Sequence, residues 1–261
     1  MEKNNDQSFW EMTGREMPAF CEAPSTRYYF ECEKGLFQRY FPELRDKRIL
    51  KTDLWDEAKN SRILHWAADG GAKVYGIDIS AETLAQARSV FQSCSSRHSA
   101  CFIISDVRKI GFASDYFDYL YSMGTVEHSP EYYAGLEECF RVLKRGGRAI
   151  IGVPNKLDPF LRPACVTLLH RFKLYAYGYE LSFTARHFNR LLRQVGFRIV
   201  ANTGILFMPG LLRMLDLYFF CYRPWATRLT APLIAPFAFS YRRFAWLRRH
   251  GYLIASVVEK P

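Results

Sequence analysis

The sequence lacks the features that mark several common classes of protein. Its seven cysteines include no Cys-x-x-Cys pair, so we expect reduced thiols and no metal site. The first residues, MEKNNDQSFWEM, are polar and acidic, unlike the start of a signal peptide. No apolar run approaches the ~20 residues that a membrane-spanning helix needs. These absences favour a cytoplasmic protein.

Glycine is missing where a nucleotide-binding fold normally has it. Residues 49–60, ILKTDLWDEAKN, have the pattern of a strand, a turn and a helix, but they contain no glycine. A nicotinamide-dependent dehydrogenase needs a Gly-x-Gly-x-x-Gly turn here, because its backbone amides hold the pyrophosphate. The sequence therefore disfavours that class.

Charge is divided unevenly between the two halves of the 261-residue chain. Residues 1–140 hold 16 basic and 22 acidic residues, whereas residues 141–261 hold 20 and 4. This asymmetry suggests that the second half faces an anionic partner, such as a membrane surface or a phosphorylated substrate. The alternative is an ordinary solvated basic face.

Strand-like and helix-like segments alternate along most of the chain. The expected strands are 47–54, 72–80, 100–106, 117–124, 148–155, 198–207 and 252–260, and the expected helices are 26–41, 60–69, 81–91, 131–147 and 182–197. Asn60 or Ser61, Ser80 and Thr184 are candidate N-caps, and Gly196 ends a helix. Such alternation predicts an α/β fold with a doubly wound, mostly parallel sheet.

Acidic residues follow three of the expected strands. Asp53, Asp78 and Asp106 come after the first, second and third strands. In an open parallel sheet, ligands bind beyond the carboxyl ends of the strands. An acid after the second strand can accept hydrogen bonds from both hydroxyls of a ribose, although a structural cap is the alternative.

Three segments together resemble the class I S-adenosylmethionine (SAM)-dependent methyltransferases that act on small molecules. They are VYGIDISAETLAQAR, SDVRKIGFASDYFDYLYSMGTVEH and LEECFRVLKRGGRAIIGVPN. The resemblance covers residues 48–155 and continues through FTARHFNRLLRQVGF to the closing strand. It implies a Rossmann-like seven-stranded sheet whose last strand is antiparallel, with SAM as cofactor.

The resemblance also implies roles for residues after the second and third strands. Asp78 would bind the SAM ribose, and Ile79 would pack beside the adenine. Asp106 would accept a hydrogen bond from the adenine amino group, and the backbone of Val107 would contact the ring nitrogen. These four residues are the predicted nucleoside site.

The first strand departs from the family pattern, since LKTDLWDEA replaces the usual acidic, glycine-rich loop. SAM has no pyrophosphate and therefore does not need a nest of backbone amides. Asp53, Asp56 or Glu57 could pair with its ammonium group, and Thr52 with its carboxylate. Lys51, where the family usually has an acid, favours the alternative of a non-catalytic relative.

The end of the fourth strand supplies the candidate catalytic residues. By resemblance, Met123 and Gly124 would lie along the methionine part of SAM. Glu127 and His128 follow, where acceptors usually bind in this family, and a histidine has a suitable pKa for a general base. A structural role for the pair, as cap and hydrogen-bond partner, is the alternative.

We expect three parts: a helical N-terminal lid segment (1–45), a SAM-binding core (46–155), and a C-terminal part with a helical insertion, a substrate lid and closing strands (156–261). Arg27, Tyr28 and Tyr29 are candidates for lining the site, or for packing on the sheet.

We expect the variable C-terminal part to select the acceptor. Residues 208–251 combine aromatic residues, leucines and arginines, a composition that suits a membrane interface. A small-molecule acceptor, lipid-like or delivered from an anionic membrane, is one hypothesis, and a soluble molecule under a hydrophobic lid is the other. Nucleic acid is disfavoured, because MGTVEH stands where a base-flipping methyltransferase has its Asn-Pro-Pro-Tyr-like motif. A catalytically inactive binding or scaffold protein is the remaining alternative.

Overall fold

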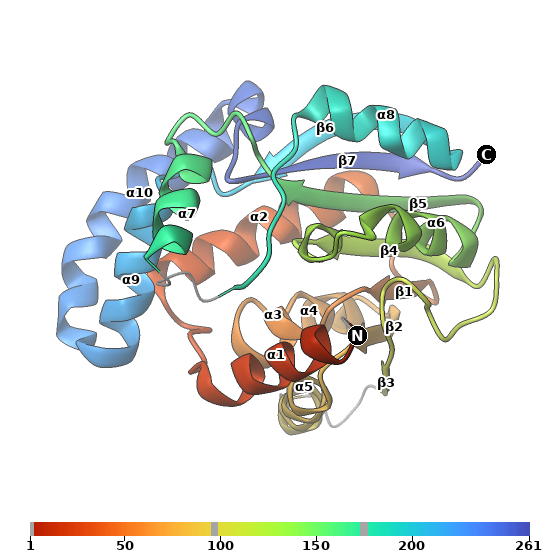
Figure 1. The fold of residues 1–261 in the computed structure, drawn as a ribbon, viewed down its shortest axis with the longest axis horizontal. Coiled ribbons are helices and arrows are strands. Elements are labelled where there is room, and N and C mark those ends of the chain that lie inside the picture. Colours follow the sequence, from red (N-terminus) through yellow and green to blue (C-terminus); the bar gives the residue numbers. More distant parts are fainter. Residues whose placement is uncertain (1–2, 95–98, 173–176) are drawn as a thin grey trace.

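The computed structural model describes residues 3–94, 99–172 and 177–261, which form one seven-stranded sheet flanked by helices (Figure 1). The strands are β1 (Arg48–Lys51), β2 (Lys73–Asp78), β3 (Ala100–Ile104), β4 (Phe117–Met123), β5 (Leu143–Pro154), β6 (Arg198–Ile205) and β7 (Leu253–Glu259). Their order is β3-β2-β1-β4-β5-β7-β6. Strands β1 to β5 are parallel, and β7 is antiparallel to β5 and β6. The predicted fold class is confirmed.

The helices cover both faces of the sheet and one of its ends. They are α1 (Lys3–Glu16), α2 (Pro24–Tyr40), α3 (Trp55–Lys59), α4 (Ile63–Asp69), α5 (Ala81–Cys94), α6 (Tyr132–Val142), α7 (Arg162–Arg171), α8 (Ala185–Val195), α9 (Gly210–Tyr222) and α10 (Thr227–Arg243), with short 3-10 turns η1 (Val126–His128), η2 (Pro224–Ala226) and η3 (Ala245–Arg249). In Figure 1, α7, α9 and α10 gather at one end of the molecule.

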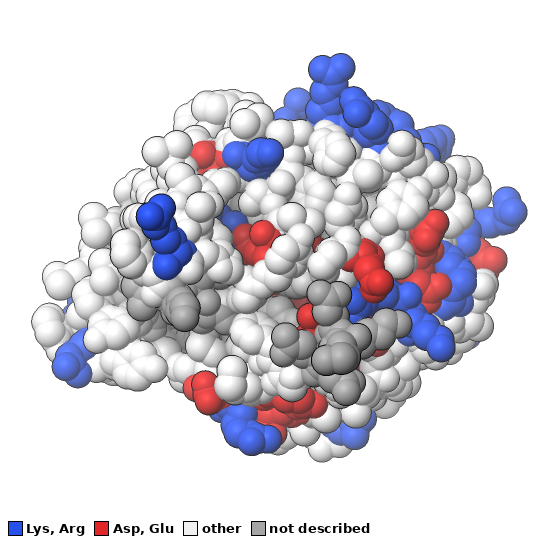
Figure 2. Space-filling model, in the orientation of Figure 1, with Lys and Arg blue, Asp and Glu red and all other residues white. Residues whose placement is uncertain are grey.

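Charged residues are distributed unequally over the visible face. Lys and Arg side chains gather over α8, whereas the end formed by α7, α9 and α10 is mostly uncharged (Figure 2). Helix α8 contributes three arginines, and its buried Phe188 and Leu192 face the sheet. Part of the basic excess of the second half is therefore an ordinary amphipathic helix.

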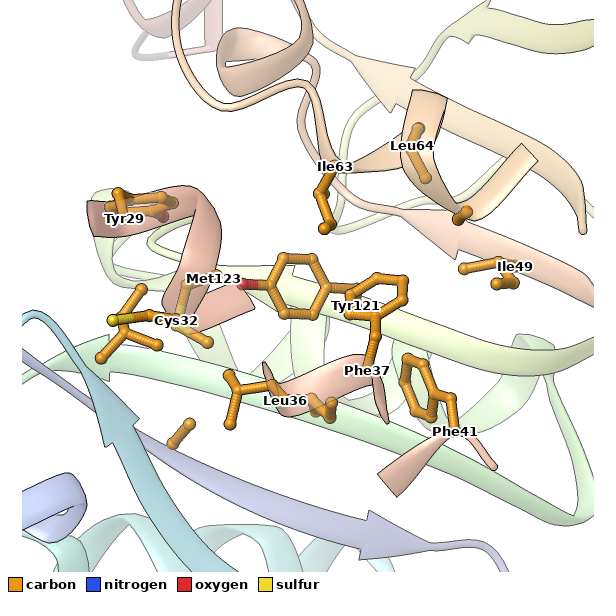
Figure 3. Close-up of a cluster of buried hydrophobic side chains, with 14 of the residues drawn as sticks. Tyr29, Cys32, Leu36, Phe37, Phe41, Ile49, Ile63, Leu64, Tyr121 and Met123 are labelled. Atoms are coloured by element: carbon orange, nitrogen blue, oxygen red, sulfur yellow. The ribbon is translucent and has the colours of Figure 1, made fainter. Parts of the chain in front are cut away.

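Two apolar cores lie on opposite faces of the sheet, because side chains alternate along a strand. Ile49 belongs to the core under α2, α4 and α5, and its neighbour Leu50 belongs to the core under α6 and α8. At the centre of the first core, the ring of Tyr121 lies 5.1 Å from that of Phe37 (Figure 3). This packing holds α2 against β1 and β4, whose ends carry the site.

The predicted C-terminal end of α6 is wrong. The helix expected over 131–147 ends at Val142, and β5 begins at Leu143 because Leu143 pairs with Phe117 of β4. Gly146, with φ +72°, donates its N–H to the carbonyl of Lys260, so sheet pairing prevails over helical pattern.

The N-cap expected for α4 is also wrong, because both candidate side chains bind elsewhere. Asn60 Nδ2 donates to Asp56 at 2.6 Å, and the Ser61 hydroxyl donates to Glu33. The residue at the cap position is Arg62, in the left-handed region.

The other predicted caps are confirmed. The Ser80 hydroxyl accepts from the N–H of Thr83 at 3.1 Å, and that of Thr184 accepts from the N–H of His187 at 3.3 Å. Gly196 ends α8 with φ +115°.

The C-terminal part holds the segments that the sequence left unassigned. The insertion expected over 156–181 contains α7, while its residues 173–176 lie outside the described residues. Helices α9 and α10 form an antiparallel hairpin joined to α2 by Asp216, which accepts from the N–H of Ser25 and the hydroxyl of Thr230. Across the described ranges, each helix is too short or too polar to pass through a bilayer.

Candidate active site

Two adjoining clefts open at the carboxyl ends of the parallel strands. The first cleft has a volume of about 670 Å³ and lies beside the ends of β2 and β3; the second, of about 890 Å³, lies between the end of β4 and α9. Four residues line both clefts: Trp10, Trp55, Gly124 and His128. The clefts therefore meet at the tip of β4.

Asp78 is a fixed acceptor on the wall of the first cleft. Its Oδ2 accepts from the N–H of Leu54 at 2.8 Å, and its Oδ1 accepts from the N–H of Ser80 at 2.9 Å. Burial raises the pKa of this carboxyl to about 7, although the two backbone donors oppose the rise. Each oxygen retains a lone pair, so the carboxylate can also accept from a ligand.

Asp106 also lines the first cleft, but Arg108 already binds it. Arg108 Nη2 lies 2.6 Å from Oδ2, and Arg108 Nε lies 3.0 Å from Oδ1. Asp6 of α1 lies 3.4 Å from the same guanidinium. The predicted adenine acceptor is therefore part of an ion-pair cluster that also holds α1.

The remaining predicted cofactor residues divide between the two clefts. Ile79, Val107 and Thr52 line the first cleft, Met123 lines the second, and Gly124 lines both. Gly124 has φ +77°, which glycine adopts without strain. Asp53 lines the second cleft, so the three strand-end acids face one continuous space rather than one pocket.

The glycine-free turn is organised around a buried lysine. Lys51 is fully buried, and its Nζ lies 3.0 Å from Asp53 Oδ1 and 3.4 Å from Asp56 Oδ2. Asp53 Oδ2 accepts from the hydroxyl of Thr125 at 3.0 Å, and the Thr52 hydroxyl lies 3.2 Å from that of Thr125. Side chains therefore stabilise the turn without backbone amides of glycine.

The electrostatics of this turn leave an excess of acid. Burial alone would lower the pKa of Lys51, but Asp53, Asp56, Glu57 and Glu33 raise it, so the ammonium stays charged. Burial raises the pKa of Asp53 in spite of Lys51. Four acids face one lysine, so a cationic ligand group nearby would stabilise their ionised forms.

Glu57 is the predicted cofactor residue that lines neither cleft. Its Oε1 accepts from the N–H of Leu64 at 3.2 Å, in the first turn of α4. Burial raises its pKa to about 7. The structure thus gives Glu57 a contact inside the fold.

His128 and Glu127 lie at the junction and in the second cleft. His128 Nδ1 lies 2.8 Å from the carbonyl oxygen of Tyr179, and burial lowers the pKa of the imidazole. Since a carbonyl only accepts, Nδ1 carries the proton and Nε2 is the basic atom of the neutral ring. Glu127 is buried, and burial followed by the charge of Glu180 raises its pKa well above the usual range.

The sequence missed several residues of the clefts. Trp10 of α1 contacts the His128 ring edge-on, with 5.0 Å between centroids, and lines both clefts. Arg162 and Glu180 form a buried pair with 2.6 Å between Nη1 and Oε1 in the second cleft. A lone tryptophan in a polar segment leaves no local pattern, and neither does a pair whose members lie 18 residues apart.

Of the three aromatic-segment candidates, only Tyr29 lines a cleft, the second. Its hydroxyl donates to Asp56 Oδ2 at 3.4 Å. Tyr28 is buried in the core, and exposed Arg27 pairs with Glu22. The packing alternative therefore describes Tyr28.

The chemistry of the first cleft fits SAM. Asp78 offers carboxylate oxygens for ribose hydroxyls, and Ile79 and Val107 offer apolar surface for the adenine. The acidic surplus around Lys51 lies toward the second cleft, where the cationic end of SAM would extend. Lys51 itself lines neither cleft, and Trp55 forms a wall of both. Among the described residues, no group of three metal-ligating side chains comes together.

Comparisons with known proteins agree with this fit. A family model described as a methyltransferase domain matches residues 58–151. Methyltransferase phqN of Penicillium fellutanum is 36% identical over 78 residues, which are 30% of this chain and 24% of the relative. A Mycolicibacterium smegmatis protein described as a probable SAM-dependent methyltransferase is 23% identical over 201 residues, covering 77% of this chain and 70% of its own.

Solved structures show the same fold at low sequence identity. The magnesium protoporphyrin IX methyltransferase of Synechocystis, with S-adenosylhomocysteine bound, has a TM-score of 0.59 and 14% identity, covering 91% of this chain and 84% of its own. The match to phqN spans about a quarter of that relative's length, so it supports a shared segment and not a shared activity of the whole proteins. Residues 58–151 therefore match a methyltransferase domain, and the described residues share the fold of solved methyltransferase structures.

Proposed function

We propose that the protein transfers a methyl group from SAM to a hydroxyl or amine of a small, lipid-like acceptor. The observation that carries this proposal is the junction of the two clefts at Gly124 and His128. A nucleoside in the first cleft and an acceptor in the second would meet there. SAM would supply a methyl carbon on a sulfonium, and the neutral thioether that leaves would need no activation.

The protein's main task is then to align the acceptor about 3 Å from the methyl carbon in a dry space. Trp10 and Trp55 lie on the walls where the clefts meet and would exclude water. Asp78 would hold the ribose hydroxyls. Because its carboxyl is fixed by two backbone donors, it would bind without reorganising.

His128 would remove the acceptor proton. The Tyr179 carbonyl holds the ring with Nε2 as its basic atom, and the lowered pKa keeps the imidazole neutral near pH 7. A purely structural role predicts that His128→Gln leaves turnover unchanged.

Two polar atoms of the second cleft would orient the acceptor. Glu127 Oε2 and Arg213 Nη1 are buried and have no hydrogen-bond partner among the described residues. The raised pKa leaves Glu127 protonated and able to donate, while Arg213 provides a positive charge. An acceptor with an oxygen-rich polar end would satisfy both atoms.

The walls of the second cleft support a lipid-like acceptor. The apolar residues among them are Phe20, Met123, Leu206, Met214, Leu217 and Leu253. Two come from α9, in the basic, aromatic C-terminal part. We propose that the protein acts in the cytoplasm, at the periphery of an anionic membrane that delivers the acceptor.

Calorimetry with SAM and S-adenosylhomocysteine tests the cofactor site. We expect wild type to bind both and Asp78→Ala to bind at least about tenfold more weakly, since hydrogen bonds to a charged group contribute about 1.5–3 kcal/mol. Asp46→Ala, an exposed acid, is the matched control. Equal SAM affinity in wild type and Asp78→Ala would refute the ribose assignment.

Transfer itself is measured with methyl-labelled SAM and a total lipid extract as acceptor source. We expect label in the lipid fraction with wild type, and a loss of about 10²-fold or more with His128→Gln.

One observation favours a second candidate, a catalytically inactive binding protein. Lys51 stands where the family has an acid and pairs with Asp53 and Asp56, the groups expected to bind the SAM ammonium. SAM binding without transfer to lipid or water-soluble extracts would support this second candidate.

A further inference from the structure

We infer that the outer face of the α9–α10 hairpin, with the turns η2 and η3, docks on an anionic lipid bilayer. We call this surface the hairpin face. The inference deepens the proposed function and rests on it for one point, that the acceptor arrives from the docked bilayer. The docking itself is argued from exposure and charge.

Helix α9 has one exposed side that carries no charge. Leu211, Leu215, Tyr218 and Tyr222 are 44–57% exposed. Their spacing of four, three and four residues places them on one side of the helix. Asp216, on the other side, is fully buried against α2 and α10. The exposed stripe is therefore not the side that holds α9 in the fold.

Helix α10 repeats the arrangement. Leu229, Leu233 and Phe239 are exposed, whereas Ile234 and Tyr241 are buried. The Tyr241 hydroxyl donates to the carbonyl of Gly204 at 2.8 Å, which fixes the inner side of α10 to β6. Both helices of the hairpin thus leave an apolar side uncovered.

Two tryptophans extend the face beyond the helices. Trp225 in η2 is 68% exposed and Trp246 in η3 is 63% exposed. Soluble monomers rarely expose contiguous apolar surface of this extent without a partner. Tryptophan at the borders of an apolar surface is typical of segments that lie in a membrane interface.

The charges around the face select an anionic partner. Residues 209–251 contain seven arginines and a single acid, the buried Asp216. Exposed Arg223 and Arg228 lie near the tip of the hairpin, and Arg242, Arg243 and Arg249 lie at its base. Figure 2 shows the end that contains the hairpin as mostly uncharged, with few basic groups. Arginines beside an apolar face can reach lipid phosphates while the apolar residues enter the acyl region.

A second copy of the chain is a poorer occupant than a bilayer. In a symmetric dimer the same patch meets itself, so the arginines at tip and base would enter an interface without any exposed acid to pair with. A bilayer of anionic lipid covers the leucines and neutralises the arginines together.

The hairpin face borders the second cleft. Met214 is 45% exposed and also lines the cleft, and Leu217 and Arg213 line it from the same helix. Docking through α9 would therefore bring the cleft close to the lipid headgroups. The guanidinium of Arg213, 4.9 Å from the Tyr29 ring centroid, stands at this boundary.

Vesicle flotation of the full chain tests the inference. We expect association with phosphatidylcholine vesicles that contain phosphatidylglycerol, little with phosphatidylcholine alone, and release as salt rises. The double variant Leu215→Ser/Tyr218→Ser should lose association. The double variant Arg242→Glu/Arg243→Glu should weaken it by about 25-fold or more, since each basic residue contributes roughly fivefold.

Matched controls come from exposed residues far from the hairpin. Ile104→Ser on β3 and Arg186→Glu/Arg193→Glu on α8 should bind vesicles like wild type. No association of wild type with anionic vesicles, or equal association of the hairpin variants, would overturn the inference. So would a dimer that Leu215→Ser/Tyr218→Ser converts to a monomer while wild type ignores vesicles. Calorimetry with SAM on the same variants separates this failure from failure of the proposed function, because docking does not require SAM.

Discussion

Two regions of the molecule break the usual rule that charged side chains are exposed and apolar side chains are buried. One is the strand-end turn around Lys51, and the other is the α9–α10 hairpin. Four acids surround the one fully buried lysine of the turn, whereas the hairpin exposes leucines, tyrosines and tryptophans. Buried charges need partners, and exposed apolar surface needs a cover. In the turn most partners are supplied within the chain. At the hairpin the described residues leave the apolar surface uncovered, and this exposure is the basis of the proposed contact with a bilayer.

The largest expected effect is a loss of stability when the buried lysine of the turn is replaced. Lys51→Met should lower the free energy of unfolding by about 3–5 kcal/mol, because it leaves Asp53 and Asp56 buried without their counter-charge. Urea unfolding measures the change. Lys73→Met removes an exposed pair with Asp46 and should change stability by less than about 1 kcal/mol. A loss for Lys51→Met no larger than for this control would show that the buried cluster is not held by its lysine.

The second effect is a dependence of SAM affinity on pH. The pKa of Asp78 is raised from 3.8 to about 7, so the acceptor form is lost as pH falls through about 7. SAM affinity, measured by calorimetry, should fall up to about tenfold per pH unit below that value. Asp78→Asn should bind weakly with little dependence on pH.

The stability of the free protein should change in the opposite sense. A raised carboxyl pKa means that the folded state binds more protons than the unfolded state between the two values. The Asp78 contribution to stability is therefore greatest at low pH and declines as pH rises toward about 7. A SAM affinity that is flat across pH 7, or that falls as pH rises, would contradict the assignment.

A smaller effect concerns helix α1. Glu11 accepts from the N–H groups of Ala81 and Glu82 at 2.7 and 3.0 Å, and so caps α5 from another helix. Glu11→Ala should cost about 1 kcal/mol in thermal unfolding, the usual contribution of an N-cap. It should also weaken SAM binding, because neighbouring Trp10 lines both clefts. Glu16→Ala, exposed at the end of α1, is the control and should change neither property.

The smallest expected effect is on stability, when an exposed leucine of the hairpin is shortened. Leu233→Ala on the hairpin should change the free energy of unfolding by less than about 0.5 kcal/mol, because Leu233 is 56% exposed and packs on little. Leu36→Ala, fully buried in α2, should cost about 2–5 kcal/mol by the same chemical change. A large loss for Leu233→Ala would mean that the hairpin face is packed within the fold rather than free for a partner.

Local patterns carried much of the fold. The strands were predicted from alternation and apolar runs, and the caps at Ser80 and Thr184 from residue type, because both signals act over a few residues. The end of α6 was wrong because pairing of Leu143 with Phe117 is not local. The hairpin was left unassigned, since Pro232 and Pro236 interrupt the helical pattern of α10.

The candidate site shows the same division. Asp78 and Asp106 were predicted from their positions after parallel strands, and Ile79 and Val107 from the family resemblance; all four line the first cleft. Trp10 was missed because nothing local brings α1 to the strand ends. In the sequence, Lys51 favoured a non-catalytic relative. In the structure, its ion pairs with Asp53 and Asp56 stabilise the turn that faces the second cleft.

The sequence by itself determined the α/β architecture, the acids at the strand ends and the basic excess of the second half, because periodicity, strand order and charge are properties of the chain. Only the tertiary structure decided that the acids face two joined clefts, that Trp10 of α1 lines both of them, and that α9 and α10 turn their apolar sides outward. Those outcomes depend on which distant residues meet, and burial, pairing and exposure exist only once they have met.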